Sequence, residues 1–271
     1  MGDASSYREE ARYDVQAATY DGTRSASPSV MRLLLKFLGP GGARSVLDVA
    51  GGTGNYAQAL ADAGFRPFVV DRERAMLARA TAKIGRSRQV VGDALALPIR
   101  DGGVDAAICV SALHQFPDQR RALAEMRRVL RDGPLVVQAF IAESLVPSYV
   151  FDYFPDPGAP QAVHPSEEEI VAMLREAGFT RVERERFVYE DLSDGTVHAL
   201  QNDAEAVADP DRLRNTSFFQ KLSPSVQADG LAALRRDLER GVLHERAREG
   251  LRLAREYGQG AVFAAWGSSR G

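Results

Sequence analysis

The sequence has very little cysteine and very little lysine. Cys109 is the single cysteine among 271 residues, which excludes an internal disulfide and a zinc site built from cysteines. We therefore expect a reducing, cytoplasmic setting and no metal. Only three lysines occur, and the formal net charge of -3 gives no overall field that would hold a polyanion. Nucleic acid is accordingly not an expected partner.

Long hydrophobic runs are also missing. No stretch approaches the roughly eighteen apolar residues that a membrane helix needs, and the first residues, Met1 to Tyr7, are polar and lack the apolar centre of a signal peptide. Hydrophobic residues make up 45% and charged residues 26% of the chain, close to the average of globular proteins. These values predict one domain with a buried core and no association with a membrane.

Short β-branched runs alternate with amphipathic helical stretches, a pattern typical of a parallel sheet with crossover helices. Ser166 and Glu169 form a capping box that predicts the start of one of these helices. We expect a seven-stranded, mostly parallel sheet with helices on both faces and an antiparallel last strand. The expected strands cover residues 44–50, 67–71, 89–91, 104–110, 135–141, 180–188 and 260–266.

Residues 189–260 interrupt this alternation with polar, mostly helical sequence. We therefore predict a single domain over 1–271. Its parts are a cofactor-binding core over 44–188, an N-terminal helical cover over 1–43, a helical lid and substrate insertion over 189–260, and a last strand over 261–267.

The strongest motif runs from Asp48 to Gly54, between a predicted strand and a predicted helix. Its glycines let a ligand approach backbone N–H groups, and the helix N-terminus favours a carboxylate or phosphate. Asp71 ends the next strand, where doubly wound folds present a carboxylate to ribose hydroxyls. That position suits NAD and S-adenosylmethionine alike, but an acid at Asp48 would repel a pyrophosphate. A plain strand-to-helix bend is the alternative for the glycines alone.

These motifs resemble the class I, Rossmann-like S-adenosylmethionine-dependent methyltransferases over about residues 44 to 188. The resemblance rests on the segments 46–54, 69–71 with Met76, 92–94 with 97–98, 111–114 and 126–131. It implies that the glycines line the methionine moiety, that Asp71 holds the ribose and that Asp93 with Ala94 holds the adenine, with Met76 against the ring. The full set of expected cofactor residues is Tyr20, Arg24, Asp48, Ala50, Gly51, Gly52, Gly54, Asp71, Arg72, Met76, Asp93, Ala94, Leu95 and Ser111.

The segment from Ala17 to Arg24 is similar to one that folds over the cofactor in such enzymes. The resemblance implies that Tyr20 touches the sulfonium region, since an aromatic ring suits a cation, and that Arg24 meets the amino-acid carboxylate. A helix-capping surface segment is the alternative.

His114 follows the fourth predicted strand, at the edge where open α/β sheets place ligands. We predict it as the general base, with Tyr20 as a second catalytic candidate; a wall of the cofactor site is the alternative. His164 precedes the capping box and is interpreted as a helix-entry residue. Aromatic residues in the loop from Glu143 to Pro165 and in the insertion are either substrate contacts or a packing cluster. The predicted substrate residues are His114, Tyr149, Tyr153, Phe154, Phe218 and Phe219.

The resulting hypothesis is methyl transfer from S-adenosylmethionine to an oxygen, nitrogen or carbon of a small molecule, of the kind made in secondary metabolism. The alternatives are a peptide or protein side-chain methyltransferase and a non-catalytic or NAD-binding module. A homodimer stays open at this point.

Overall fold

The computed structural model describes residues 20–39, 44–144, 148–155 and 164–268. Its centre is one seven-stranded sheet in the order β3-β2-β1-β4-β5-β7-β6, in which only β7 runs antiparallel to its neighbours. The expected mostly parallel sheet with an antiparallel last strand is confirmed. The strands are β1 (Ser45–Val49), β2 (Arg66–Asp71), β3 (Gln89–Val91), β4 (Ala106–Val110), β5 (Leu135–Ala139), β6 (Phe179–Phe187) and β7 (Gly260–Gly267).

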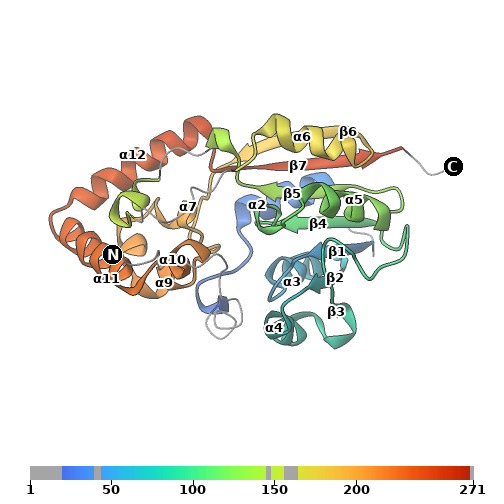
Figure 1. Cartoon of the computed structure of the whole chain (residues 1–271), viewed down its shortest axis with the longest axis horizontal. Helices are drawn as coiled ribbons and strands as arrows, with labels where there is room; N and C mark the ends of the chain where they lie inside the picture. The colour runs from blue at the N-terminus through green and yellow to red at the C-terminus, as the bar shows by residue number, and fades with distance from the viewer. Residues whose placement is uncertain (1–19, 40–43, 145–147, 156–163, 269–271) are drawn as a thin grey trace, which may run out of the picture.

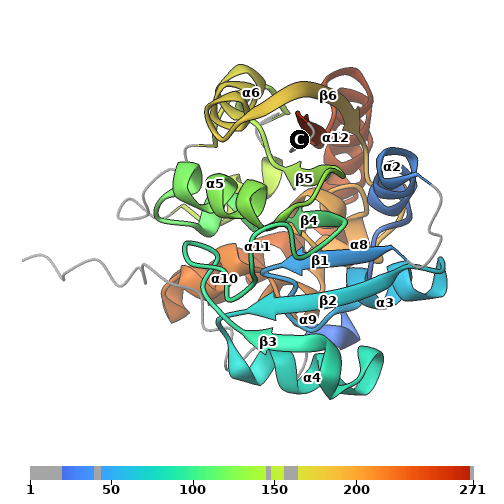
Figure 2. The same ribbon diagram turned by 90° about the vertical axis from the view of Figure 1, so that its right-hand side faces the viewer.

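Helices cover both faces of the sheet because its central strands are apolar on both sides (Figure 2). In β1, Leu47 and Val49 face one core and Val46 faces the other. The first core is completed by α5 (Gln119–Val129) and α6 (Glu167–Glu176). The opposite face is covered by α2 (Pro28–Leu38), α3 (Asn55–Asp62) and α4 (Arg74–Ile84).

The capping box at the start of α6 is confirmed. The Ser166 hydroxyl accepts the Glu169 N–H at 3.2 Å, and the Glu169 carboxylate accepts the Ser166 N–H at 2.7 Å. Two otherwise unpaired donors at the helix N-terminus are satisfied in this way, so the helix begins where the sequence pattern places it.

The described part of the predicted N-terminal helical cover consists of α2 and a short helix before it. Within the described residues 20–39, α2 buries Val30, Leu33 and Leu34 against the face of the sheet and so belongs to its core. A short 3-10 helix, η1 (Tyr20–Gly22), precedes it, while residues 1–19 of the predicted cover lie outside the described part of the chain.

Residues 197–257 form a helical lobe at one end of the sheet (Figure 1). The lobe has its own apolar core, which also includes Val150 of η5 (Tyr149–Tyr153) and Phe154, the residue after η5. Its role as a lid stays a prediction. The helices are α7 (Val197–Leu200), α8 (Ala204–Ala208), α9 (Pro210–Arg214), α10 (Ser217–Lys221), α11 (Pro224–Glu239) and α12 (Val242–Tyr257). Throughout the described ranges, no helix has the length and hydrophobicity that crossing a bilayer requires.

Replacing either of two helical glycines of the lobe with alanine is expected to change stability, in opposite directions for the two positions. A Cβ on Gly230 would lie 2.2 Å from the Phe154 ring and 2.6 Å from the Tyr153 carbonyl oxygen, whereas one on Gly250 would make an ordinary 3.6 Å contact with Tyr149. We expect Gly230→Ala to lower the free energy of unfolding by about 1–3 kcal/mol through overpacking. Gly250→Ala should raise it by about 0.5–1 kcal/mol, because alanine favours the helix.

Urea denaturation of both variants beside the parent protein measures these changes. Equal effects of the two substitutions would contradict the packing of η5 against α11.

Candidate active site

The loop after β1 turns sharply beneath the end of β2. The Ala50 N–H donates to the Val70 carbonyl at 2.8 Å, and Ala50 and Gly52 both have a φ of 56°. A positive φ costs a side chain such as that of Ala50 of order 1 kcal/mol or more and is found mainly where function requires it. The loop leads directly into α3, whose first residue is Asn55.

Asp48 lies buried under this loop, with 2% of its surface exposed. A Cβ on Gly51 would come within 2.5 Å of the Asp48 carboxyl carbon, so only glycine leaves room for the acid. The Asp48 Oδ2 is buried without a hydrogen-bond partner. Burial, and secondarily the nearby Asp71, raises the Asp48 pKa to about 8. An unpartnered buried acid of this kind is suited to a ligand with a positive charge.

Asp71 is the last residue of β2 and accepts hydrogen bonds from two loops. Its Oδ2 accepts the Gly52 N–H at 2.8 Å and its Oδ1 accepts the Glu73 N–H at 2.8 Å. Burial raises the Asp71 pKa, and the two N–H donors act in the opposite direction. The carboxylate therefore fixes the glycine loop relative to the start of α4.

Residues 20–24, which are η1 and the two residues after it, contact the glycine loop and the start of α3. The Thr53 hydroxyl donates to Asp21 at 2.7 Å, and the Asn55 amide donates to the Arg24 carbonyl at 3.0 Å. The Arg24 guanidinium forms an ion pair with Asp194 at 2.7 Å and also lies 5.4 Å from the centroid of the Tyr20 ring. Tyr20 and Arg24 thus lie beside the loop, and Arg24 is already paired with a carboxylate of the same chain. Their contacts with the cofactor stay predictions.

Asp194 is a site residue that the sequence pattern did not identify. It is 5% exposed and accepts hydrogen bonds from Arg24 and from the Tyr56 hydroxyl, the latter at 3.2 Å. It lies between β6 and the helical lobe, in a stretch without strand or helix periodicity, so its position depends on how the chain returns to the sheet edge.

A narrow cavity of about 70 Å³ lies between these segments. Seven of the predicted cofactor residues line it: Tyr20, Arg24, Asp48, Ala50, Gly51, Gly52 and Ser111. Its lining also includes Ser25, Thr53, Asn55, Tyr56, Val110 and Asp194.

Ser111 follows β4 with a φ of 53°, and its hydroxyl donates to the Gln138 side-chain oxygen at 2.6 Å. In the described residues, Ala50 and Ser111 are the non-glycine residues with positive φ, and both line this cavity.

The other predicted cofactor residues lie around the cavity's margin or support it. Gly54 packs closely on Ala80, and Met76 is buried. The exposed Asp93 accepts the Leu95 N–H at 2.9 Å, which shapes the loop after β3, and Ala94 is buried. Arg72 is exposed and lies 3.3 Å from Glu73. Their contacts with a cofactor stay predictions.

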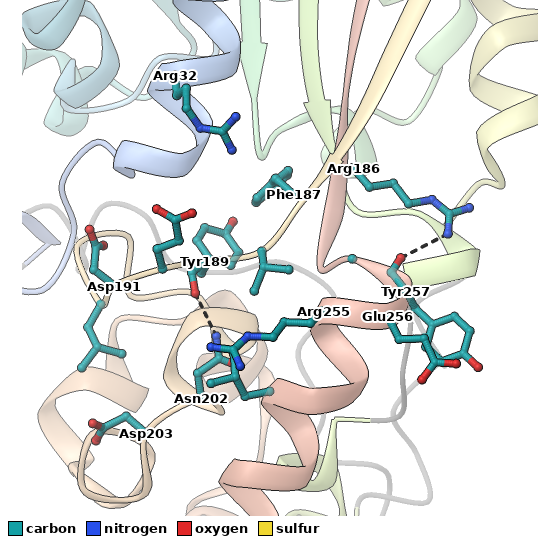
Figure 3. A pocket seen from close by; sticks show the side chains of 15 residues that line it. Arg32, Arg186, Phe187, Tyr189, Asp191, Asn202, Asp203, Arg255, Glu256 and Tyr257 are labelled. Atoms are coloured by element: carbon teal, nitrogen blue, oxygen red, sulfur yellow. Dashed lines mark hydrogen bonds between the residues drawn. The ribbon is translucent and has the colours of Figure 1, made fainter.

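A second, larger cavity of about 630 Å³ lies between α2, the end of β6 and the end of α12 (Figure 3). Arg32, Arg186 and Arg255 line it together with Glu190, Asp191, Asp203 and Glu256. This mixture of charges selects no ion of one sign. None of the predicted site residues lines it, so the smaller cavity is the better candidate site.

His114 lies in η3 (Leu113–Gln115), directly after β4, and has two histidine neighbours. Its ring centroid is 5.5 Å from that of His164 and 6.0 Å from that of Phe140, and Phe140 stacks on His198 at 4.5 Å. Burial lowers the His114 pKa to about 3 and the His198 pKa to about 4. His114 is therefore neutral at pH 7, but a weaker base than its ordinary pKa would suggest. The sequence offered no reason to connect His198 with this group.

The predicted substrate aromatics pack mainly among themselves. Phe154 lies 5.9 Å from Phe218 and 5.5 Å from Phe219 between ring centroids, and Phe154 and Phe219 are buried in the core of the lobe. The Tyr149 hydroxyl donates to the Gln201 carbonyl at 2.9 Å and the Tyr153 hydroxyl to Asp237 at 2.7 Å. These contacts favour the packing alternative, and a role in substrate binding stays a prediction.

Residues 47–137 match the family described as "Methyltransferase domain". A ubiquinone/menaquinone biosynthesis C-methyltransferase of Acidiphilium cryptum is 32% identical over 185 residues, which are 56% of this chain and 70% of that protein. A malonyl-[acyl-carrier protein] O-methyltransferase of Geobacter sulfurreducens is 33% identical over 62% of this chain and 68% of its own length. The chain belongs to the class I S-adenosylmethionine-dependent methyltransferases.

The solved structures agree with this assignment at the level of the fold. A methyltransferase from an antibiotic biosynthesis pathway of Anabaena variabilis superposes with a TM-score of 0.74 at 24% identity, covering 90% of this chain and 98% of that one. The protein is thus an enzyme whose methyl donor is S-adenosylmethionine. The small cavity suits the positive charge of this cofactor, because Asp48 lines it and the Asp48 Oδ2 has no hydrogen-bond partner. Asp71 lies outside the lining, and its contact with the ribose stays a prediction.

The raised pKa of Asp48 leads to a test of stability against pH. The ligand-free folded methyltransferase keeps a proton on Asp48 that the unfolded chain loses above about pH 4, so this group lowers stability progressively until about pH 8. We expect Asp48→Asn to stabilise the ligand-free protein by about 1–3 kcal/mol at pH 8, with little gain at about pH 5. Urea denaturation across this range measures the difference.

The same variant should bind S-adenosylhomocysteine more weakly in calorimetry. Asp62→Asn, on the exposed end of α3, is the matched control. A stability gain independent of pH would contradict the role given to the buried acid.

The buried His198 predicts that stability falls as the pH is lowered, which is the opposite of the effect of Asp48. Because its folded pKa is lowered to about 4, stability is present above its unfolded value near 6.5 and is lost as the pH falls toward 4. Between pH 7 and pH 5 this histidine should account for a loss of about 2 kcal/mol. His198→Gln should flatten the profile by that amount, and His244→Gln on α12 serves as the control. An unchanged slope in His198→Gln would show that the ring is not buried as described.

Proposed function

We propose that the methyltransferase acts on a small molecule, of the kind made in secondary metabolism, and methylates an oxygen, nitrogen or carbon nucleophile of it. The observation that carries the proposal is the position of the small cavity, between the glycine loop, residues 20–24 and the Asp194 region. On the Asp194 side of the cavity the chain leads into the helical lobe, where residues 148–155 and 197–257 build an apolar core of their own.

The relatives differ in the atom that they methylate, and the acceptor of one of them is attached to a carrier protein. The relative of Acidiphilium cryptum is a C-methyltransferase of ubiquinone and menaquinone biosynthesis, and that of Geobacter sulfurreducens is an O-methyltransferase of malonyl-[acyl-carrier protein]. Methylation of a peptide or protein side chain is the alternative.

The bound cofactor supplies an electrophilic methyl group on a sulfonium. In our proposal, Asp48 faces the α-ammonium group of the cofactor, and Asp71 accepts from the ribose hydroxyls. Arg24, held by Asp194, and Tyr20 close the other side of the cavity. In this arrangement the chain's residues orient the methyl group and exclude water, which are the main sources of rate in a displacement that disperses charge.

Asp71 is expected to hold the ribose in addition to the loop. Asp71→Ala should weaken S-adenosylhomocysteine binding by about 1–3 kcal/mol, because buried hydroxyls lose their acceptor. Calorimetry with an analogue that lacks both ribose hydroxyls separates the two roles. The parent protein should lose affinity for this analogue, whereas Asp71→Ala should bind it and S-adenosylhomocysteine equally. A further loss in the variant would mean that the ribose binds elsewhere.

The acceptor class is tested with S-adenosylmethionine that carries a labelled methyl group. The enzyme is incubated with a panel of hydroquinones, phenols, amines and carboxylic acids, and in parallel with unfolded protein. Label in the small acceptors and not in the protein supports the proposal. Label in the protein alone overturns it in favour of side-chain methylation.

A further inference from the structure

Three of the four histidines of the chain lie together around one phenylalanine. His114 follows β4, His164 precedes α6, and His198 lies in α7. The ring centroid of Phe140 is 6.0 Å from that of His114, 5.9 Å from that of His164 and 4.5 Å from that of His198. Segments far apart in the sequence therefore bring three imidazoles to the end of β5.

The position of this histidine cluster (His114, His164 and His198) relative to the cavity is set by β4. Ser111 lines the cavity and lies three residues before His114. The backbone of His198 is held by Gln259, whose side chain donates to the His198 carbonyl at 2.6 Å. His198 is buried, while His114 and His164 are half-buried and so remain accessible in part.

The cluster has hydrogen-bonding capacity that the protein leaves unused. The Nδ1 atom of His164 is buried without a hydrogen-bond partner. Unused polar atoms at a buried site cost free energy, so their presence calls for an occupant that pairs with them.

One positive charge next to the cluster favours an anion. The pKa of all three histidines is lowered, in each case chiefly by burial, so the rings are neutral at pH 7 and offer N–H donors but no charge. The ammonium group of Lys221 also lowers the His114 pKa. An anion bound here would therefore gain from the charge of Lys221 and from the imidazole N–H groups, against the cost of burying it.

Two other uses of the cluster fit less well. Among the residues that the structure describes, no group of three His, Cys, Asp or Glu side chains is arranged to hold a metal ion. The His114 pKa of about 3 lies about seven units below that of a hydroxyl of pKa near 10. Proton transfer from such a hydroxyl to His114 is therefore unfavourable by a factor of about ten million. His114 is thus better suited to donate a hydrogen bond than to remove a proton.

We propose that the histidine cluster is an acceptor subsite that recognises the acidic hydroxyl group of a phenol or enol and holds it as the anion. This inference rests on the proposed function, because it places the acceptor next to the cavity assigned to the cofactor. It adds a substrate class and gives His164 and His198 a role beside His114.

The reaction balances without a protein base. The hydroxyl proton passes to solvent when the acceptor ionises, and imidazole N–H groups then donate to the oxyanion. An electron pair of the anion, on oxygen or on a ring carbon that shares the charge, forms the new bond to the methyl carbon. The carbon–sulfur bond breaks and its pair stays on sulfur; after attack by carbon, the ring proton leaves to solvent.

The probe for the test is 4-nitrophenol, whose anion has its own visible absorbance. It is titrated against pH with and without the methyltransferase loaded with S-adenosylhomocysteine. We expect the pKa of the bound phenol to fall by about one, which corresponds to about tenfold tighter binding of the anion than of the neutral form. His114→Gln and His198→Gln should each weaken binding of the anion about tenfold and abolish this preference.

His244→Gln is the matched control, since His244 lies on α12 and pairs with Glu205 at 2.9 Å. Calorimetry with S-adenosylhomocysteine shows whether each variant is folded and keeps its cofactor site. A variant that has lost this binding is replaced by the asparagine variant at the same position.

A raised pKa of the bound phenol would overturn the inference in favour of an imidazole that accepts from a neutral hydroxyl. Absence of 4-nitrophenol binding at millimolar concentration would also overturn it, while binding of S-adenosylhomocysteine leaves the proposed function intact. Failure of the parent protein to bind S-adenosylhomocysteine would instead count against the proposed cofactor site.

Discussion

The carboxylate of Asp48 ends up in the interior of the sheet with one oxygen unpaired, and the geometry around it follows from that position. Because the acid lies directly under the loop, residue 51 has no room for a side chain. The loop is then carried over the acid by two residues with positive φ, Ala50 and Gly52, and is held in place by Asp71. The ligand-free protein bears the cost of two neighbouring buried acids, and a cation at this place would relieve it.

The walls of the site come from parts of the chain that are far apart in sequence. Asp21 and Arg24 contact the glycine loop, and Arg24 in turn is held by Asp194, 170 positions further on. The helical lobe is therefore connected to the cofactor side through a buried ion pair. A ligand that draws Arg24 toward its own carboxylate would compete with Asp194, so cofactor binding and the placement of the lobe are expected to be coupled.

Much of the sheet could be predicted from the sequence because its signals are local. The apolar runs define the strands, and the Ser166–Glu169 pair defines a helix start, since each depends on neighbours within a few residues. Asp48 and Asp71 could be identified for the same reason, as acids at strand ends beside a glycine turn.

The other site residues are brought together by contacts between segments that are far apart in the sequence. Asp194 and His198 lie in polar sequence after β6, and nothing within that sequence indicates that the chain comes back to Arg24 and Phe140. The aromatics at 149–154 and 218–219 have the composition of a binding loop, but their spacing does not distinguish a pocket from the core of the lobe in which they pack. The strength of His114 as a base depends on burial and on Lys221, which lies more than a hundred positions away.

The central claim is that a positive charge of the bound cofactor pairs with the buried carboxylate of Asp48. It is tested most directly by counting protons when S-adenosylhomocysteine, which carries an α-ammonium group, binds at pH 7. Calorimetry in two buffers of different ionisation enthalpy gives this number. Because the Asp48 pKa is about 8 in the ligand-free protein, its ionisation on binding should release nearly one proton per site, and Asp48→Asn should release none. Equal proton release by the two proteins would contradict the account.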